Sequence, residues 1–213
     1  MENELLEKAI AYIKVIFEND SSGHDFYHSL RVYKSATQIA KIEHANIFLV
    51  QLAALLHDTD DAKLFGTSNH LSHAVAFMEQ NAVPPETIEA VCHIIREISF
   101  KGKESVKPSS LEGMIVQDAD RLDAIGAIGI ARTFAYGGSR NRIIYNPEEK
   151  PLLEMTKEQY INNKGTSVNH FYEKLLSLKD LMNTDTARKV AKERHEFMET
   201  FLEQFYDEWD GIR

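Results

Sequence analysis

Helical periodicity is the sequence feature that most restricts the fold of this chain. Apolar residues recur at spacings of three and four through most of the 213 residues, which is the pattern of helices with one buried face. At the N-terminal end, the pattern runs through Leu5, Leu6, Ala9, Ile10, Ile13, Ile16 and Phe17. No stretch of useful length alternates apolar and polar residues, as a half-buried strand would. The sequence therefore predicts an all-α protein.

Breaks and capping patterns divide this periodicity into separate helices. Asn19 to Gly23 and Lys101 to Lys103 interrupt it, and Pro85 suits the first turn of a helix. Ser109-Ser110-Leu111-Glu112 has the pattern of a capping box and predicts the start of a helix that carries three aspartates. Two further helices are expected near 167–182 and 185–209, after an irregular stretch over 138–155 that forms either a lid or a surface loop. In the last helix, an apolar stripe is expected to include Val190, Phe197, Met198, Phe201, Leu202, Phe205 and Trp209.

Composition restricts the partners and the compartment. Lysine and arginine number 24 against 33 aspartates and glutamates, so the net charge is −9. This charge argues against a general nucleic-acid or anionic membrane surface, since both attract basic residues. The single cysteine, Cys92, allows no internal disulfide, and the start of the chain is acidic, unlike a secretory signal. No apolar stretch is long enough to span a bilayer, and we expect a cytoplasmic protein.

The dipeptide His57-Asp58 is the strongest chemical signal in the sequence. It follows the almost wholly apolar run 49–56, which predicts that the pair lies at the end of a buried helix. Burying a histidine and an aspartate is costly unless something binds them, and a divalent cation would do so. His28 and Asp120 lie on other predicted helices and complete a set of two imidazoles and two carboxylates. Such a set suits Mn, Fe, Co, Ni or Zn better than an all-oxygen Mg or Ca site.

Each of these residues also has an ordinary structural interpretation. A lone histidine near an apolar helix is more often a core or surface residue than a metal ligand. Three aspartates, Asp118, Asp120 and Asp123, crowd one predicted helix, and the residues alone do not say which of them would bind a metal. The significance of the pattern therefore lies in several matches occurring in one order.

The order His, His-Asp, Asp resembles the HD-domain superfamily of metal-dependent phosphohydrolases. Three blocks carry the resemblance, namely 24–32, 55–58 and 116–123, which contains Ala119-Asp120-Arg121. It implies that His28, rather than His24, is the first ligand and that Asp120 is the fourth. Asp118 or Asp123 remain alternative ligands, or with Arg121 they support the ligands from outside the metal shell. The resemblance favours one divalent ion, with Mn2+ preferred and Mg2+, Fe2+, Co2+, Ni2+ or Zn2+ as alternatives.

The resemblance also suggests catalytic and substrate-binding residues. In similar nucleotide-directed members, an acidic residue three positions after the His-Asp pair acts on the attacking water, which here is Asp61. Asp60 is its rival, and an exposed acidic turn is the simpler interpretation of both. Four side chains are candidates to contact the phosphates of a substrate: Arg31, Lys63, His93 and Lys101. Arg31 could instead pair with one of the acidic residues, and Lys63 and Lys101 have the same alternative.

The resemblance implies a single helical domain over 1–213, with an HD core at about 23–131 and a C-terminal helical extension at about 156–210. The segment 169–184 is similar to the closing region of a bacterial HD branch of this size. The implied activity is hydrolysis of a small phosphoester, chiefly a nucleoside or deoxynucleoside triphosphate to its monophosphate and pyrophosphate. The alternatives are a nucleoside monophosphatase, a cyclic-nucleotide phosphodiesterase, a non-catalytic nucleotide sensor and a two-iron oxygenase. The sequence indicates no oligomeric state.

Overall fold

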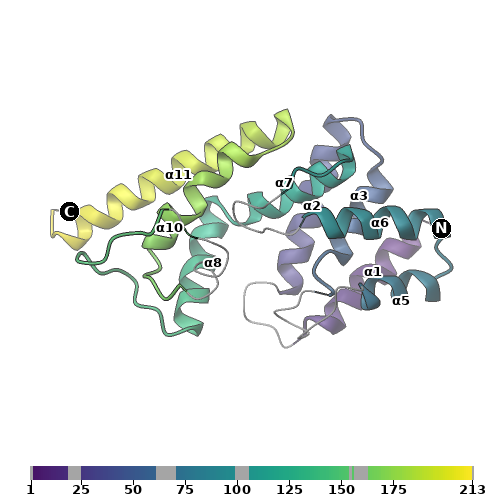
Figure 1. The fold of residues 1–213 in the computed structure, drawn as a ribbon, viewed down its shortest axis with the longest axis horizontal. Coiled ribbons are helices and arrows are strands. Elements are labelled where there is room, and N and C mark those ends of the chain that lie inside the picture. Colours follow the sequence, from purple (N-terminus) through teal and green to yellow (C-terminus); the bar gives the residue numbers. More distant parts are fainter. Residues whose placement is uncertain are drawn as a thin grey trace. The chain divides into compact units, whose positions relative to one another are not determined.

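The fold is described by a computed structural model that covers residues 2–18, 25–60, 71–98, 106–153, 155 and 163–212. Every regular element in these ranges is a helix (Figure 1), so the all-α prediction is confirmed. The chain forms two compact units, Met1–Asp120 and Arg121–Arg213. Their grouping as one domain stays a prediction. No helix within the ranges described is long and apolar enough to cross a membrane.

An almost wholly apolar helix lies at the centre of the first unit. This helix, α3 (Ile47–Leu56), packs against three of its neighbours. Val50 and the five residues from Leu52 to Leu56 are all buried, as expected for a helix that is apolar on almost every side. The other helices of the unit are α1 (Glu2–Ile16), α2 (Phe26–Ile42), α5 (Ser72–Gln80), α6 (Pro85–Ile98) and α7 (Leu111–Asp123). The last three residues of α7 belong to the second unit.

The starts of α6 and α7 can be compared with the signals in the sequence. Pro85 is the first residue of α6, as predicted. At α7, the Ser110 hydroxyl accepts a hydrogen bond from the Gly113 N–H at 3.1 Å, but the expected reciprocal capping box does not form. Glu112 instead accepts a hydrogen bond from the backbone N–H of Asn46 at 3.0 Å. This contact ties the start of α7 to the start of α3.

The second unit is organised around a long C-terminal helix. This helix, α11 (Asp185–Trp209), has the predicted bounds and packs against α8 (Gly126–Ser139) and the 3-10 helix η2 (Leu175–Leu181). The predicted apolar stripe is wrong at Phe197 and Trp209, which are 53% and 50% exposed. The buried face of α11 is formed by Ala187, Ala191, His195, Met198 and Leu202.

The prediction of one continuous helix over 167–182 is wrong. The segment forms a short helix, α10 (Asn169–Glu173), followed by η2. Leu175 and Leu178 are both buried, and a 3-10 helix places residues three apart on one face, whereas an α-helix would offset them. The tighter winding therefore lets both leucines enter the core.

The stretch between α8 and α10 is irregular, but it is anchored. Gly138, expected to begin this irregular stretch, lies in the last turn of α8. Backbone N–H groups of Ser167 and Val168 donate to the carbonyls of Ile143 and Ile144 at 3.1 and 3.0 Å. The Asn169 side chain donates to the Glu149 carbonyl at 3.0 Å. Residues 143–149 are thus fastened to the segment that precedes and begins α10.

Candidate metal centre

His28 lies in the first turn of α2, and an aspartate fixes that turn. Asp25 occupies the N-cap position, and its Oδ1 accepts a hydrogen bond from the His28 N–H at 2.7 Å. This contact satisfies one of the N–H groups that a helix leaves unbonded at its start. The cap was missed in the sequence, although an aspartate three residues before His28 is a typical N-cap signal. The His28 side chain is completely buried.

His57 and Asp58 lie where α3 ends in the interior of the first unit. His57 is the C-cap residue of α3, and Asp58 follows in a turn. Each is 8% exposed. The Nδ1 atom of His57 lies 2.9 Å from the carbonyl oxygen of Ala54. Because a carbonyl can only accept a hydrogen bond, Nδ1 carries the proton and Nε2 presents its lone pair.

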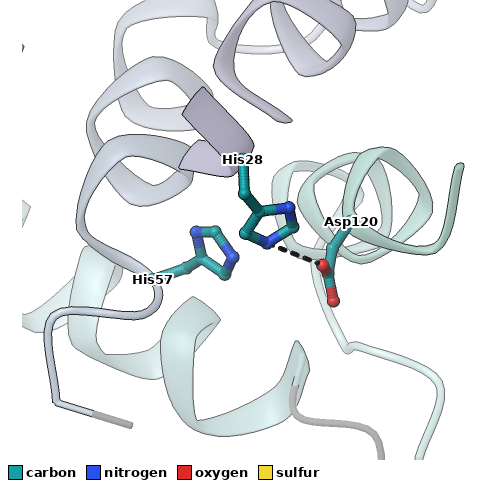
Figure 2. A group of neighbouring side chains, drawn as sticks. All are labelled: His28, His57 and Asp120. Carbon is teal, nitrogen blue, oxygen red and sulfur yellow. Dashed lines mark ion pairs between the residues drawn. The ribbon is translucent and has the colours of Figure 1, made fainter. Parts of the chain in front are cut away.

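Four side chains from three separate segments converge at this point. Figure 2 shows His28 from α2, His57 from the end of α3 and Asp120 from α7 directed toward one another. One potential ligand atom from each of these three lies within 4.8 Å of the others. Asp58 Oδ2 lies 3.3 Å from Nε2 of both histidines, and Asp120 Oδ1 lies 3.4 Å from Nε2 of His28.

The histidine nitrogens at the centre of this group suit a metal ion. The Nε2 atom of His57 is buried and makes no hydrogen bond to any described residue, a state that is costly unless another ligand occupies it. Metal-binding histidines commonly donate the other ring N–H to a carbonyl, as His57 does to Ala54. The two imidazoles and two carboxylates therefore fit a divalent cation, which the charge of the carboxylates would offset.

The electrostatics of the group favour positive charge at its centre. Burial lowers the pKa of His57, but the carboxylates of Asp58 and Asp120 overcome this effect and raise it above the usual value. Burial raises the pKa of Asp120, but the contacts with His28 and His57 hold it well below the usual value. A divalent cation bound at this point would compete with protons for the histidine nitrogens.

Comparison with known proteins identifies the family. The HD-domain family model matches residues 25–125, which include all four converging side chains. The Bacillus subtilis protein YpgQ is 41% identical over 209 residues, covering 97% of this chain and 94% of YpgQ. The chain belongs to the HD-domain superfamily. The recognition made from the three sequence blocks is thereby confirmed.

Solved structures of relatives align over nearly the whole chain. An HD-superfamily hydrolase from Bacillus thuringiensis is 44% identical, with 99% of each chain covered and a TM-score of 0.78. A Lactobacillus plantarum protein is 42% identical, with 97% of each chain covered and a TM-score of 0.86. YpgQ in complex with ADP aligns by structure at 35% identity, covering 98% of this chain and all of YpgQ, with a TM-score of 0.76. Family membership supports a hydrolase role for this HD-domain protein.

The three aspartates of α7 have different surroundings in this HD-domain protein. Asp120 lies beside the histidines. Asp118 is completely buried. Asp123 accepts a hydrogen bond from Nη1 of Arg132 at 2.9 Å within the second unit. Arg121, also in the second unit, donates to the Leu181 carbonyl. The geometry thus brings Asp120 into the histidine group and engages Asp123 and Arg121 elsewhere.

The predicted substrate-binding residues are only partly described. Arg31 is half-buried on α2, the helix that carries His28. His93 lies on α6, where its Nε2 is 2.9 Å from the Ser109 hydroxyl and 3.4 Å from Glu97, and it is not part of the group around His57. The other candidate side chains lie outside the described residues, namely Asp61, Lys63 and Lys101.

Asp60, the rival of Asp61 in the sequence, is fully engaged in hydrogen bonds. Its carboxylate is 7% exposed and accepts hydrogen bonds from the backbone N–H groups of His73 and Ala74 at 2.9 and 3.0 Å. Burial raises the pKa of Asp60, but these bonds and the His73 side chain outweigh burial and lower it. Sequence reasoning missed these contacts because both partners lie more than ten residues away along the chain.

Proposed function

We propose that this protein is a metal-dependent phosphohydrolase that converts a nucleoside or deoxynucleoside triphosphate to its monophosphate and pyrophosphate. The observation that carries the proposal is the buried Nε2 of His57, which receives no hydrogen bond from a described donor and lies within a group of two imidazoles and two carboxylates. A nucleotide substrate is supported by the relative YpgQ, whose structure was solved with ADP.

The ligands in this proposal are His28, His57, Asp58 and Asp120. A divalent cation held by them would polarise a phosphoryl oxygen and lower the pKa of water, and Mn2+ is the ion that we favour. The two histidines would each supply Nε2, since Nδ1 of His57 is held by Ala54. The negative charges of the two carboxylates would balance the charge of the cation. Basic side chains would then be needed to bind the negatively charged phosphates of the substrate.

Hydrolysis would occur at the α-phosphorus of the triphosphate. Water forms the new bond to phosphorus, and the bond to the bridging oxygen of the pyrophosphate breaks. We assign to Asp61 the role of accepting the proton of the attacking water. Arg31, Lys63, His93 and Lys101 are the proposed contacts for the phosphates, which require local positive charge in a protein of net charge −9. A cytoplasmic location accords with such a substrate.

Turnover of metal-free protein against a panel of nucleotides tests this function. Mn2+, Mg2+, Fe2+, Co2+, Ni2+ or Zn2+ would be added back singly, and both orthophosphate and pyrophosphate would be measured, with His57→Ala as the matched control. We expect pyrophosphate from triphosphates in wild type and none in the variant. Orthophosphate from monophosphates would instead indicate a nucleotidase, and hydrolysis of cyclic nucleotides a phosphodiesterase. Tight metal binding without any turnover would contradict the proposed hydrolase activity and favour a non-catalytic nucleotide sensor.

A further inference from the structure

We propose that Asp60 is a positioning residue that holds the His57–Asp58 turn in place through the first turn of α5. The inference rests on the proposed metal centre, because Asp60 acts on the metal only through the neighbouring ligands. Asp58 is separated from Asp60 by a single residue, so a displacement of Asp60 moves a carboxylate that lies 3.3 Å from both histidines.

Among the described residues, the side chain that caps the first turn of α5 is that of Asp60, which is distant in the sequence. Leu71, at the N-cap position, has a left-handed backbone with φ of 49° and makes no side-chain cap. The Asp60 carboxylate takes over this role from twelve or more residues away. Oδ2 accepts from the Ala74 N–H, and Oδ1 accepts from the His73 N–H, while the Ser72 hydroxyl and His73 Nδ1 lie at 3.2 and 3.0 Å from Oδ1. An acidic cap is favoured here because it also meets the positive end of the helix.

The turn that carries the ligands is held at both ends. At its start, His57 Nδ1 contacts the Ala54 carbonyl, and the Thr59 hydroxyl donates to the Leu56 carbonyl at 2.8 Å. At its end, Asp60 is bound to α5. Asp58 lies between these two attachments, which leave little freedom for its carboxylate.

The first turn of α5 is itself fixed to another helix. The Tyr12 hydroxyl of α1 donates to the His73 carbonyl at 3.1 Å. The Tyr12 ring also stacks on Phe77, with ring centroids 4.8 Å apart. Asp60 is therefore attached to a rigid part of the first unit, and its own engagement leaves it unsuited to act on the attacking water.

Replacement of Asp60 by asparagine tests the inference. The amide keeps the size of the side chain but removes the charge and turns an N–H2 group toward backbone N–H donors. We expect Mn2+ affinity, measured by isothermal titration calorimetry, to fall by about tenfold or more, as for residues that support metal ligands in other proteins. Thr184→Ala, which removes the hydroxyl that caps α11, is the matched control and should keep wild-type Mn2+ affinity at a comparable loss of melting temperature.

The outcomes separate this inference from the proposed metal centre. If wild type binds no divalent ion, the metal centre itself is wrong, and the inference is overturned with it. If wild type binds Mn2+ and Asp60→Asn binds it equally well, only the positioning role is wrong. Should Asp60→Asn fail to fold, the milder Asp60→Glu variant keeps the charge but displaces the carboxylate by one methylene from the His73 and Ala74 N–H donors. Unchanged Mn2+ affinity in that folded variant would then overturn the role, and weakened affinity would support it.

Discussion

Individual histidines of this protein occupy opposite electrostatic surroundings. His57 lies among carboxylates, which raise its pKa. Burial is the largest effect that lowers the pKa of His170, and the positive charges of Lys174 and Arg142 lower it further, to about 3. Near neutral pH, His170 is therefore uncharged in the folded protein, and protonation of this residue opposes folding.

We expect His170 to make the protein less stable as the pH falls. The unfolded chain takes up a proton at this residue near its ordinary pKa of about 6.5, while the folded chain does so only near pH 3. Stability is thus complete above pH 6.5 and is lost progressively as the pH falls toward 3. Melting temperatures of wild type and His170→Gln between pH 7 and 5 check this expectation. The variant should lose less stability over that range, and parallel curves would contradict it.

Some residues of the candidate site can be predicted from the sequence, and others cannot. His28, His57, Asp58 and Asp120 could be selected because an apolar run, an adjacent pair and a fixed order point to them together. The geometry then separates Asp120 from Asp123, which pairs with Arg132. No sequence signal marks Asp60, because its partners at the start of α5 are set by tertiary packing. The sequence therefore indicates candidate ligands more readily than the residues that hold them.

At the scale of elements, helix α8 contains two glycines whose surroundings differ in the space they leave for a side chain. Gly129 is tightly enclosed: a Cβ atom there would lie 2.2 Å from the Ala124 carbonyl oxygen. Gly138, in the last turn, would meet nothing within 4 Å. The first glycine permits a close approach of backbone, whereas the second only adds flexibility to the unfolded chain.

Alanine at these two positions should therefore have opposite effects. Gly129→Ala forces the backbone near Ala124 to move, and we expect a loss of about 1–3 kcal/mol in the free energy of unfolding. Gly138→Ala should raise that free energy by about 0.4–1 kcal/mol, because it restricts only the unfolded chain. Urea unfolding of both variants provides the measurement. Equal effects of the two substitutions would show that α8 is packed differently.

Prediction of elements succeeded where periodicity and caps agreed. The bounds of α11 match those predicted from its apolar repeat, and in the structure the Thr184 hydroxyl caps it by accepting from the Ala187 N–H at 3.2 Å. The segment 167–182 has a similar apolar repeat, yet it divides into α10 and η2. Local spacing cannot distinguish an α-helix from a 3-10 helix when leucines at three-residue spacing satisfy both, and packing of the second unit decides between them.

For the whole molecule, the metal centre joins segments that are distant in the sequence. Its four candidate ligands come from α2, the end of α3 and α7, all within the first unit. An ion bound to them would hold these helices together only in the folded state, since the unfolded chain does not bring the ligands to one point. Binding of the ion is therefore linked to folding of that unit.

Metal removal should accordingly lower the thermal stability of the protein. At a free Mn2+ concentration of about 100 times the Kd, binding adds about 2.7 kcal/mol, which corresponds to about 5–11 °C for a chain of this size. Differential scanning calorimetry with Mn2+ and after chelation measures the shift in the transition of the first unit. Asp58→Ala removes a carboxylate that lies 3.3 Å from both histidines and should show no Mn2+-dependent shift. A shift of wild-type size in this variant would place the stabilising ion elsewhere in the molecule.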